Sequence, residues 1–279
     1  MAVESWLRPF SEHRLEVVSI LSSSGYYSDL STVFTRHSHT ESLFLNMSVS
    51  PQDARSLGHL LCTTTAEVLW QPARGWIRER HPGTLLACRV GAGQATYHRF
   101  DPRLRQHSIT FGARMIIAKH RPDTAAGWLS SREILNRGYF DGQLSTLNLL
   151  AHTCCHEFAH LLQHVAGKRK RGSVHNRHFY EILDNLHASG AAQSVRTTMQ
   201  HTAPDHGLSL PDQPFAIASS GELLAQWQVG DAVGFGSDAH WREGVVQRIN
   251  RKTCTVAGTG ASHGLRYRVP ASMLRRLET

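Results

Sequence analysis

The clearest hydrophobic periodicity in the chain runs from about residue 142 to residue 166. Apolar side chains recur there every three or four residues, as on one face of an α-helix, and Gly167 supplies a stop. The positions on this face are Leu144, Leu147, Leu150, Cys154, Phe158, Leu161, Leu162 and Val165. The pattern predicts a long helix packed against a core. After a basic turn, a second helical stripe follows at His175, Phe179, Ile182, Leu183 and Leu186.

The segments before this helix predict one more helix and several strands. Ser50 and Pro51 form a helix start, because a capping residue is followed by proline at the first helical position. Apolar spacing over residues 54–70 continues that helix. Residues 84–98 and 107–117 favour strands, the first broken by two glycines. This order of elements predicts an α+β fold rather than a wound parallel sheet.

The C-terminal third of the chain changes character twice. Residues 189–223 are rich in Gly, Ala, Ser, Thr, Pro and Gln with little periodicity, and we expect a linker there. Residues 224–279 hold four or five short strand-like segments, which predict a small β-barrel of the SH3 or KOW type. The main domain then spans residues 51–188, and residues 1–50 form an N-terminal extension without an assignment.

Composition is that of an ordinary globular protein. Of the 279 residues, 41% are hydrophobic and 19% are charged, which argues against global disorder. No apolar run is long enough to span a membrane and no secretory signal is visible, so we expect a cytoplasmic protein without membrane contact. The five cysteines include no Cys-x-x-Cys pair and predict no disulfide framework.

The strongest chemical motif, His156-Glu157-x-x-His160, falls within the long predicted helix. Residues four apart lie on the same helical face, so both imidazoles can reach one zinc ion. Glu157 is rotated by one position and can reach a water at the metal instead of the metal itself. Amide hydrolysis needs this arrangement, because zinc activates water and polarises a carbonyl while the carboxylate takes the proton.

A catalytic zinc site also needs a third protein ligand. His164 continues the four-residue series, but it lies about 12 Å from His156 along the helix axis. We therefore expect it to be solvated or to support the ligands indirectly. The metzincin pattern is excluded, because Gln163 and Ala166 occupy its glycine and third-histidine positions.

The second helical stripe offers the remaining ligands. His175 and His178 lie three residues apart and both can face back toward the motif, and Glu181 is a weaker option. The sequence also does not identify the residue that stabilises the developing negative charge during hydrolysis. Tyr180, His178 and Tyr139 are the candidates, and a structural role is the simpler interpretation of each.

Two segments together resemble a known family. The sequence HEFAHLL at residues 156–162, followed after a basic loop by VHNRHF at residues 174–179, is similar to the SprT-like metallopeptidases, which include the Spartan proteases. The family carries a later histidine at a helix start with an aromatic residue four positions on, and His175 with Phe179 has that spacing. Asn176 stands where the family usually has glycine.

The resemblance covers roughly residues 50–188 and implies a zincin-like minimal metallopeptidase domain, with a few-stranded sheet and active-site helices. It implies Zn²⁺ on His156, His160 and His175, with Glu157 as general base. The substrate it implies is protein, including proteins associated with or crosslinked to DNA. Many members carry a C-terminal cysteine-rich zinc ribbon, which this chain lacks, so the function of that part does not transfer.

Positive charge points to a nucleic acid partner. The chain has a formal net charge of +8, and Lys168, Arg169, Lys170 and Arg171 form a basic run between the two ligand segments. These cations can hold a phosphate backbone beside the site, or they can form a solvated turn. From Trp227 onward the chain contains eight basic and four acidic residues, which gives this segment a net charge of +4. DNA is therefore a possible partner at both places. A solvated turn remains the alternative for the loop, and protein binding or covering a core edge remains the alternative for the C-terminal segment.

These observations predict a zinc metalloendopeptidase that hydrolyses peptide bonds. The alternative from another class is a nucleic-acid-binding adaptor whose zinc site is structural and which has no protease activity. A closed site with a fourth protein ligand favours the adaptor, because a catalytic zinc keeps one position for water. The sequence does not indicate an oligomeric state.

Overall fold

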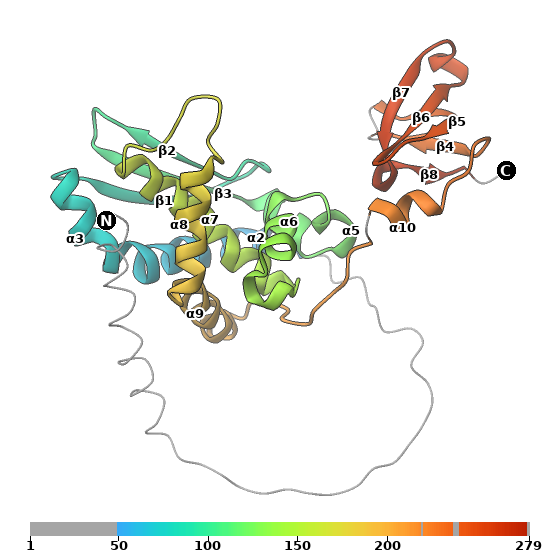
Figure 1. Ribbon diagram of the computed structural model, residues 1–279. Coiled ribbons are helices and arrows are strands. Elements are labelled where there is room, and N and C mark those ends of the chain that lie inside the picture. Colours follow the sequence, from blue (N-terminus) through green and yellow to red (C-terminus); the bar gives the residue numbers. More distant parts are fainter. Residues whose placement is uncertain (1–48, 219, 237–239, 278–279) are drawn as a thin grey trace, which may run out of the picture. The chain divides into compact units, whose positions relative to one another are not determined.

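The computed structural model describes residues 49–218, 220–236 and 240–277 (Figure 1). The extension predicted for residues 1–50 lies outside the described residues, apart from its last two. The chain forms two compact units that divide between Phe215 and Ala216. Among the described helices, none combines the length and the apolar character needed to cross a bilayer.

The described part of the N-terminal unit begins with a long helical run. Ser50 caps it by accepting a hydrogen bond from Asp53 N at 3.0 Å, and Pro51 occupies the first position. The helix predicted over residues 54–70 is therefore confirmed, and it continues further. The run comprises α2 (Pro51–Thr64), a π-helical segment η2 (Thr65–Trp70) and α3 (Gln71–Arg80).

A three-stranded sheet follows, in the order β1-β3-β2. Its strands are β1 (Leu85–Gly91), β2 (Tyr97–Asp101) and β3 (Gln106–Gly112). β3 pairs in parallel with β1 and antiparallel with β2, so that Ile109 lies opposite both Cys88 and His98. The strand predicted over residues 84–98 is thus two strands, separated at the glycines.

The strand predicted over residues 107–117 is wrong in its second half. β3 ends at Gly112 and helix α4 (Ala113–Lys119) follows directly. The apolar residues Met115 and Ile116 are both fully buried. A short continuous apolar run fits a buried strand or a buried helix equally well, and its periodicity does not separate the two.

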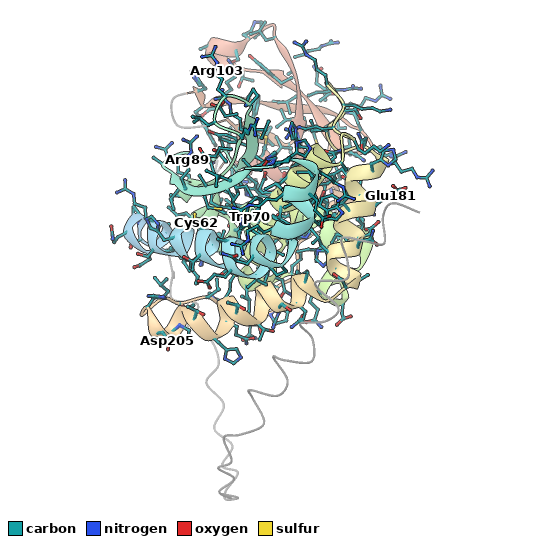
Figure 2. All side chains as sticks on the ribbon, turned by 90° about the vertical axis from the view of Figure 1, so that its left-hand side faces the viewer. Cys62, Trp70, Arg89, Arg103, Glu181 and Asp205 are labelled. Carbon is teal, nitrogen blue, oxygen red and sulfur yellow. The ribbon has the colours of Figure 1, made fainter. Side chains whose placement is uncertain are left out.

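The other helices of this unit surround one central helix, α7 (Thr146–Val165). The elements are α5 (Pro122–Ala125), α6 (Leu129–Arg137), η3 (Tyr139–Gly142), α8 (Arg177–Ala188) and α9 (Ala191–Asp205). α2 contacts β1 and β3, and α7 contacts β2 and β3, so both helices cover the sheet (Figure 1). Trp70, the last residue of η2, is buried in this unit (Figure 2).

The linker predicted over residues 189–223 is wrong for residues 191–205, which form α9. The helix follows Gly190, whose φ of 85° only glycine adopts readily. Three of the five buried residues on its inward face are alanines, so the helix carries a weak hydrophobic signal. The buried residues are Ala191, Ala192, Val195, Met199 and Ala203. The N-terminal unit therefore extends to Phe215, whose N–H donates to Leu144 O at 2.8 Å.

The C-terminal unit is built on a five-stranded antiparallel sheet in the order β7-β6-β5-β4-β8. Its elements are α10 (Ser220–Ala225), β4 (Ala232–Phe235), β5 (Arg242–Ile249), β6 (Thr253–Gly258), η5 (Gly260–Ser262), β7 (Arg266–Pro270), η6 (Ala271–Met273) and β8 (Arg275–Arg276). Val233, Val246 and Val256 lie in its core. The chain as a whole is α+β, as the order of elements predicts.

Candidate functional site

Helix α7 positions three of the predicted site residues. Ser145 caps its first turn by accepting a hydrogen bond from Asn148 N at 3.0 Å. Nearly all side chains of α7 are buried, which fixes the rotation of the helix about its axis. His156 and His160 consequently lie on one face, and Glu157 is buried beside them.

His175 reaches the same face from the loop before α8. Its neighbour Asn176 caps α8, because Asn176 Oδ1 accepts a hydrogen bond from Phe179 N at 3.1 Å. The same oxygen accepts from Gln163 Nε2 of α7 at 3.0 Å, and Asn176 Nδ2 donates to Lys168 O at 3.1 Å. Asn176 thus fastens the start of α8 to α7 and to the basic loop. Glycine at this position has no side chain for these contacts.

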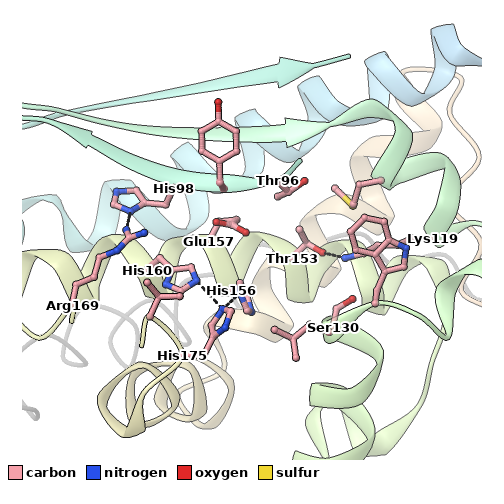
Figure 3. Close-up of a pocket in the computed structure, with 15 residues that line it drawn as sticks. Thr96, His98, Lys119, Ser130, Thr153, His156, Glu157, His160, Arg169 and His175 are labelled. Carbon is pink, nitrogen blue, oxygen red and sulfur yellow. Dashed lines mark hydrogen bonds between the residues drawn. The ribbon is translucent and has the colours of Figure 1, made fainter. Parts of the chain in front are cut away.

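The three histidines converge on one point (Figure 3). His175 Nε2 lies 3.1 Å from His156 Nε2 and 3.1 Å from His160 Nε2. Three nitrogens bound to one tetrahedral zinc at about 2.05 Å would lie roughly 3.3 Å apart. The donor set therefore fits a zinc ion in both chemistry and spacing.

Glu133 of α6 holds two imidazoles of α7 through one carboxylate oxygen. Its Oε2 lies 2.9 Å from His156 Nδ1 and 2.9 Å from His152 Nε2. A carboxylate accepts hydrogen bonds, so we place the His156 proton on Nδ1, which leaves the Nε2 lone pair for a metal. Burial by itself raises the pKa of Glu133, but the two hydrogen bonds outweigh it and hold the pKa below its usual range.

Glu133, His152 and His156 are also close enough to share an ion. Their hydrogen bonds satisfy the shared oxygen without one, and His152 Nδ1 lies 3.0 Å from His187 Nε2. Carboxylates that orient a metal-binding histidine in this way are common behind zinc sites. Glu133 is therefore better placed to support the site of the three histidines than to form a second site.

Glu157 borders a cleft of about 330 Å³ together with the three histidines. Its side chain is buried, and its Oε2 has no hydrogen-bond partner among the described residues. Burial raises the pKa of Glu157 above its ordinary value, and nearby basic groups, among them Lys119, oppose that rise. A carboxylate made more basic in this way is suited to take a proton from water.

The basic loop does not present four equivalent charges. Arg169 lines the cleft, where its Nη1 donates to His98 Nδ1 at 2.9 Å (Figure 3). All four residues are exposed, and no described carboxylate lies within 4.0 Å of the charged groups of Lys168, Lys170 and Arg171. Three of the predicted nucleic-acid contacts are thus free for a polyanion, and Arg169 belongs to the cleft.

A buried histidine pair lies behind Arg169. His98 Nε2 and His107 Nδ1 are 2.8 Å apart. Burial is the main reason that the pKa of His98 is lowered to about 2 and the pKa of His107 to about 3. His164 packs beside them, with its ring centroid 5.5 Å from that of His107 and 4.6 Å from that of Phe100. His164 is half-buried, so it stays partly solvated as expected, and its ring contacts include His107 and Phe100 but none of the three converging histidines.

The other candidates lie outside the cleft. His178 Nδ1 is 3.1 Å from Glu181 Oε2, and neither residue joins the group of converging histidines. Tyr139 donates to Asp184 and stacks on a histidine ring at 3.7 Å. Neither tyrosine candidate, Tyr139 or Tyr180, is among the residues that line the cleft. This geometry supports structural roles for His178 and Tyr139, and the ring of Tyr180 packs under the guanidinium of Arg137, 3.9 Å from the ring centroid.

Two charged residues of the site carry no local sequence signal. Glu133 is 23 positions from His156, and Lys119 is 38 positions from Glu157. Both are buried against α7, Glu133 at 4% exposure and Lys119 at 2%. Lys119 follows the apolar run of residues 115–118, which is the one hint the sequence offers, since buried charges are rare unless they are paired. Glu133 lies among polar residues of α6 and has no such hint.

The comparisons with known proteins do not identify this chain. It matched no protein-family model, and no curated protein or solved structure matched it either. The functional argument therefore depends on the geometry described above.

Proposed function

We propose that the N-terminal unit is a SprT-like zinc metallopeptidase of zincin-like fold, which hydrolyses peptide bonds in proteins. The observation that carries the proposal is the convergence of three Nε2 atoms, from His156, His160 and His175, beside the buried carboxylate of Glu157. Three nitrogen ligands without a fourth protein ligand leave a coordination position for water, as catalytic zinc sites do. Within the described residues, no other donor joins this group.

Zinc held there would supply an activated water and a polarised scissile carbonyl. Glu157 accepts a proton from the attacking water and passes it to the leaving amine nitrogen. Glu133 keeps the His156 proton on Nδ1, and Asn176 holds His175 against α7. Arg169 places a positive charge on the wall of the cleft, beside the reacting groups.

Strand β2 offers a means of aligning an extended substrate. Thr96, Tyr97 and His98 line the cleft, and β2 pairs only with β3 among the described strands. An edge strand with a free side can bind a peptide by adding it to the sheet through main-chain hydrogen bonds. We therefore place the substrate main chain along β2, with the scissile bond over Glu157.

The C-terminal unit is proposed to be a small SH3 or KOW-like barrel that contacts DNA. On the outer face of its sheet, Arg268 of β7 and Arg248 of β5 both pair with Thr255 of β6, which places the two cations in one row. Such a row suits a phosphate backbone. Protein bound to DNA is the substrate class that this pairing of units favours.

The test is the zinc content and peptidase activity of the purified chain and of Glu157→Gln. Glu157→Gln should keep one zinc per chain and lose hydrolysis of a denatured protein substrate, because the amide cannot take up the proton. His175→Ala should lose the zinc, whereas His178→Ala should keep it. An active Glu157→Gln protein refutes the role of the base. Zinc that survives in His175→Ala refutes the site.

The same purified proteins distinguish the proposed peptidase from the alternative function, an adaptor with a structural zinc. The adaptor hypothesis predicts zinc binding and DNA binding with no hydrolysis that depends on Glu157. The contact of His178 with Glu181 speaks against it, because His178 is the nearest alternative fourth ligand in sequence. A peptidase unconnected with DNA is distinguished by the absence of any stimulation of hydrolysis by DNA.

A further inference from the structure

Lys119 ends helix α4 and lies at one end of the cleft (Figure 3). Its side chain is 2% exposed, yet it lines the same cleft as Glu157. It lies beside Thr153, which precedes Glu157 by four residues, or about 6 Å along α7. Lys119 therefore lies about one helical turn from the proposed reacting groups. The proposed mechanism assigns it no role.

The ammonium of Lys119 interacts with the charge of Glu157 only at longer range and forms no direct ion pair among the described residues. It donates to Thr153 Oγ1 and lies 5.5 Å from the ring centroid of Trp128. Thr153 itself donates to Leu149 O at 2.7 Å, so its lone pairs are free to accept from the ammonium. No described carboxylate lies within 4.0 Å of Nζ. A buried charge is costly unless it is paired, and two of the three N–H donors remain available.

A second donor without a partner lines the same end of the cleft. The hydroxyl of Ser130 is buried and has no hydrogen-bond partner among the described residues. Buried hydroxyls almost always have a partner, so this one is positioned to bind something else. The walls beside it are apolar, formed by Met115, Trp128 and Leu129. One cation and one hydroxyl at the end of an apolar recess are donors suited to a carboxylate on a short aliphatic stem.

We infer that Lys119 and Ser130 form a binding site for a carboxylate of the substrate peptide. The inference rests on the proposed peptidase function and adds to it a preference for peptides that carry a carboxylate at one position. The carboxylate is either an acidic side chain close to the scissile bond or the terminal carboxylate of the peptide. Lys119 retains its charge for this purpose, since burial lowers its pKa only to about 8.

Peptide binding to the full-length, zinc-free chain tests the site without relying on catalysis. The probes are fluorescein-labelled octapeptides of Ala and Ser, read by fluorescence anisotropy. One set carries a single Glu moved through the positions, with an amidated C-terminus. The second set carries Gln in place of Glu, and the third carries Gln with a free C-terminal carboxylate.

We expect the best Glu peptide to bind at least tenfold more tightly than its Gln counterpart. Lys119→Met keeps the aliphatic stem and should abolish that ratio, and Ser130→Ala should reduce it. Arg55→Met, which removes an exposed cation of α2, should leave the ratio unchanged. A preference for the third set over the second, lost in Lys119→Met, assigns the site to a terminal carboxylate.

Equal binding of all three sets to the wild-type chain overturns the inference. A preference that survives in Lys119→Met overturns it as well, and so does an equal loss of affinity for Glu and Gln peptides in a folded Lys119→Met protein. Zinc-loaded hydrolysis is measured separately. Absence of any cleavage refutes the proposed function, and the binding ratio remains a separate result.

Discussion

The position of the proton on the His156 ring depends on Glu133, a carboxylate 23 residues away in the sequence. Glu133 accepts from His156 Nδ1 at 2.9 Å, and this contact frees Nε2 to face the two other imidazoles. Without it, the His156 ring could rotate or carry its proton on the ligating side. In the proposed metallopeptidase, the contact would therefore contribute to metal affinity although Glu133 would not itself be a ligand.

Glu133→Gln should weaken zinc binding by about 10- to 100-fold, the usual cost of losing a group that orients a ligand. Competition with a chromogenic chelator measures the affinity. Glu181→Gln is the matched control, because it alters an exposed carboxylate that contacts His178 rather than His156. Equal zinc affinity in Glu133→Gln and the wild type would show that the ring is held by packing alone.

The buried pair His98 and His107 should make the N-terminal unit sensitive to acid. Their pKa values, about 2 and about 3, lie below the ordinary value of 6.5. Between about pH 6.5 and pH 3 the unfolded chain binds more protons than the native chain, so stability falls as the pH falls. Each histidine contributes up to about 1.4 kcal/mol per pH unit in that window.

Thermal melts from pH 7.5 to pH 5.0, with a chelator present to exclude metal effects, measure this dependence. His107→Leu removes one buried titrating group and should make the fall in melting temperature shallower. His201→Leu, which alters an exposed histidine of α9, should leave the slope unchanged. A melting temperature that does not fall with pH would contradict the lowered pKa values.

The sequence predicts those site residues whose spacing is local. His156, Glu157 and His160 share a helical turn, so their proximity follows from the helix alone. Their convergence with His175 was expected only from a resemblance, because the residues themselves left His178 open. Glu133 and Lys119 were not predictable, since their contacts depend on how α6 and α4 pack against α7.

At the scale of elements, α9 shows how composition misleads. Ala, Ser and Thr make up seven of its 15 residues, and these residues are also common in linkers. Its helical face is nevertheless fully buried at Val195 and Met199, and it contacts α2, α7 and α8. Small side chains allow close packing but give a weak hydrophobic pattern. The sequence therefore predicts that the unit ends at residue 188, whereas in the structure it ends at residue 215.

Met199→Ala tests whether α9 is an integral part of the unit. The side chain is fully buried, so its truncation should lower the free energy of unfolding by about 2–5 kcal/mol. Urea denaturation measures this change. His201→Ala on the exposed side of α9 should change stability by less than about 0.5 kcal/mol. Equal stability of the two variants would restore the linker interpretation.

At the scale of the whole molecule, positive charge occurs in both units. The exposed cations of the basic loop lie in the N-terminal unit, and the row of Arg248 and Arg268 lies in the C-terminal unit. Each group suits a polyanion, and charge alone does not show which group contributes more to DNA binding. The salt dependence of the affinity separates them, because its slope reports how many phosphates each group neutralises.

Replacing Lys168, Lys170 and Arg171 together with Gln should weaken binding to duplex DNA. The slope of log affinity against log salt concentration should fall by about 3, which corresponds to three lost phosphate contacts. Arg248→Gln with Arg268→Gln is the comparison and should lower the slope by about 2 if the C-terminal unit also binds. Unchanged slopes in both variants would remove DNA from the list of partners.

The place of His175 in the chain has a mechanical consequence. It follows the basic loop, whereas His156 and His160 precede it, so a zinc ion on all three would close a ring of about 15 residues. Such a ring constrains the unfolded chain as a covalent crosslink does, and a loop of this size corresponds to about 3 kcal/mol. The ion would then tether the loop that carries Arg169, and its removal would release the wall of the cleft as well as the catalytic water.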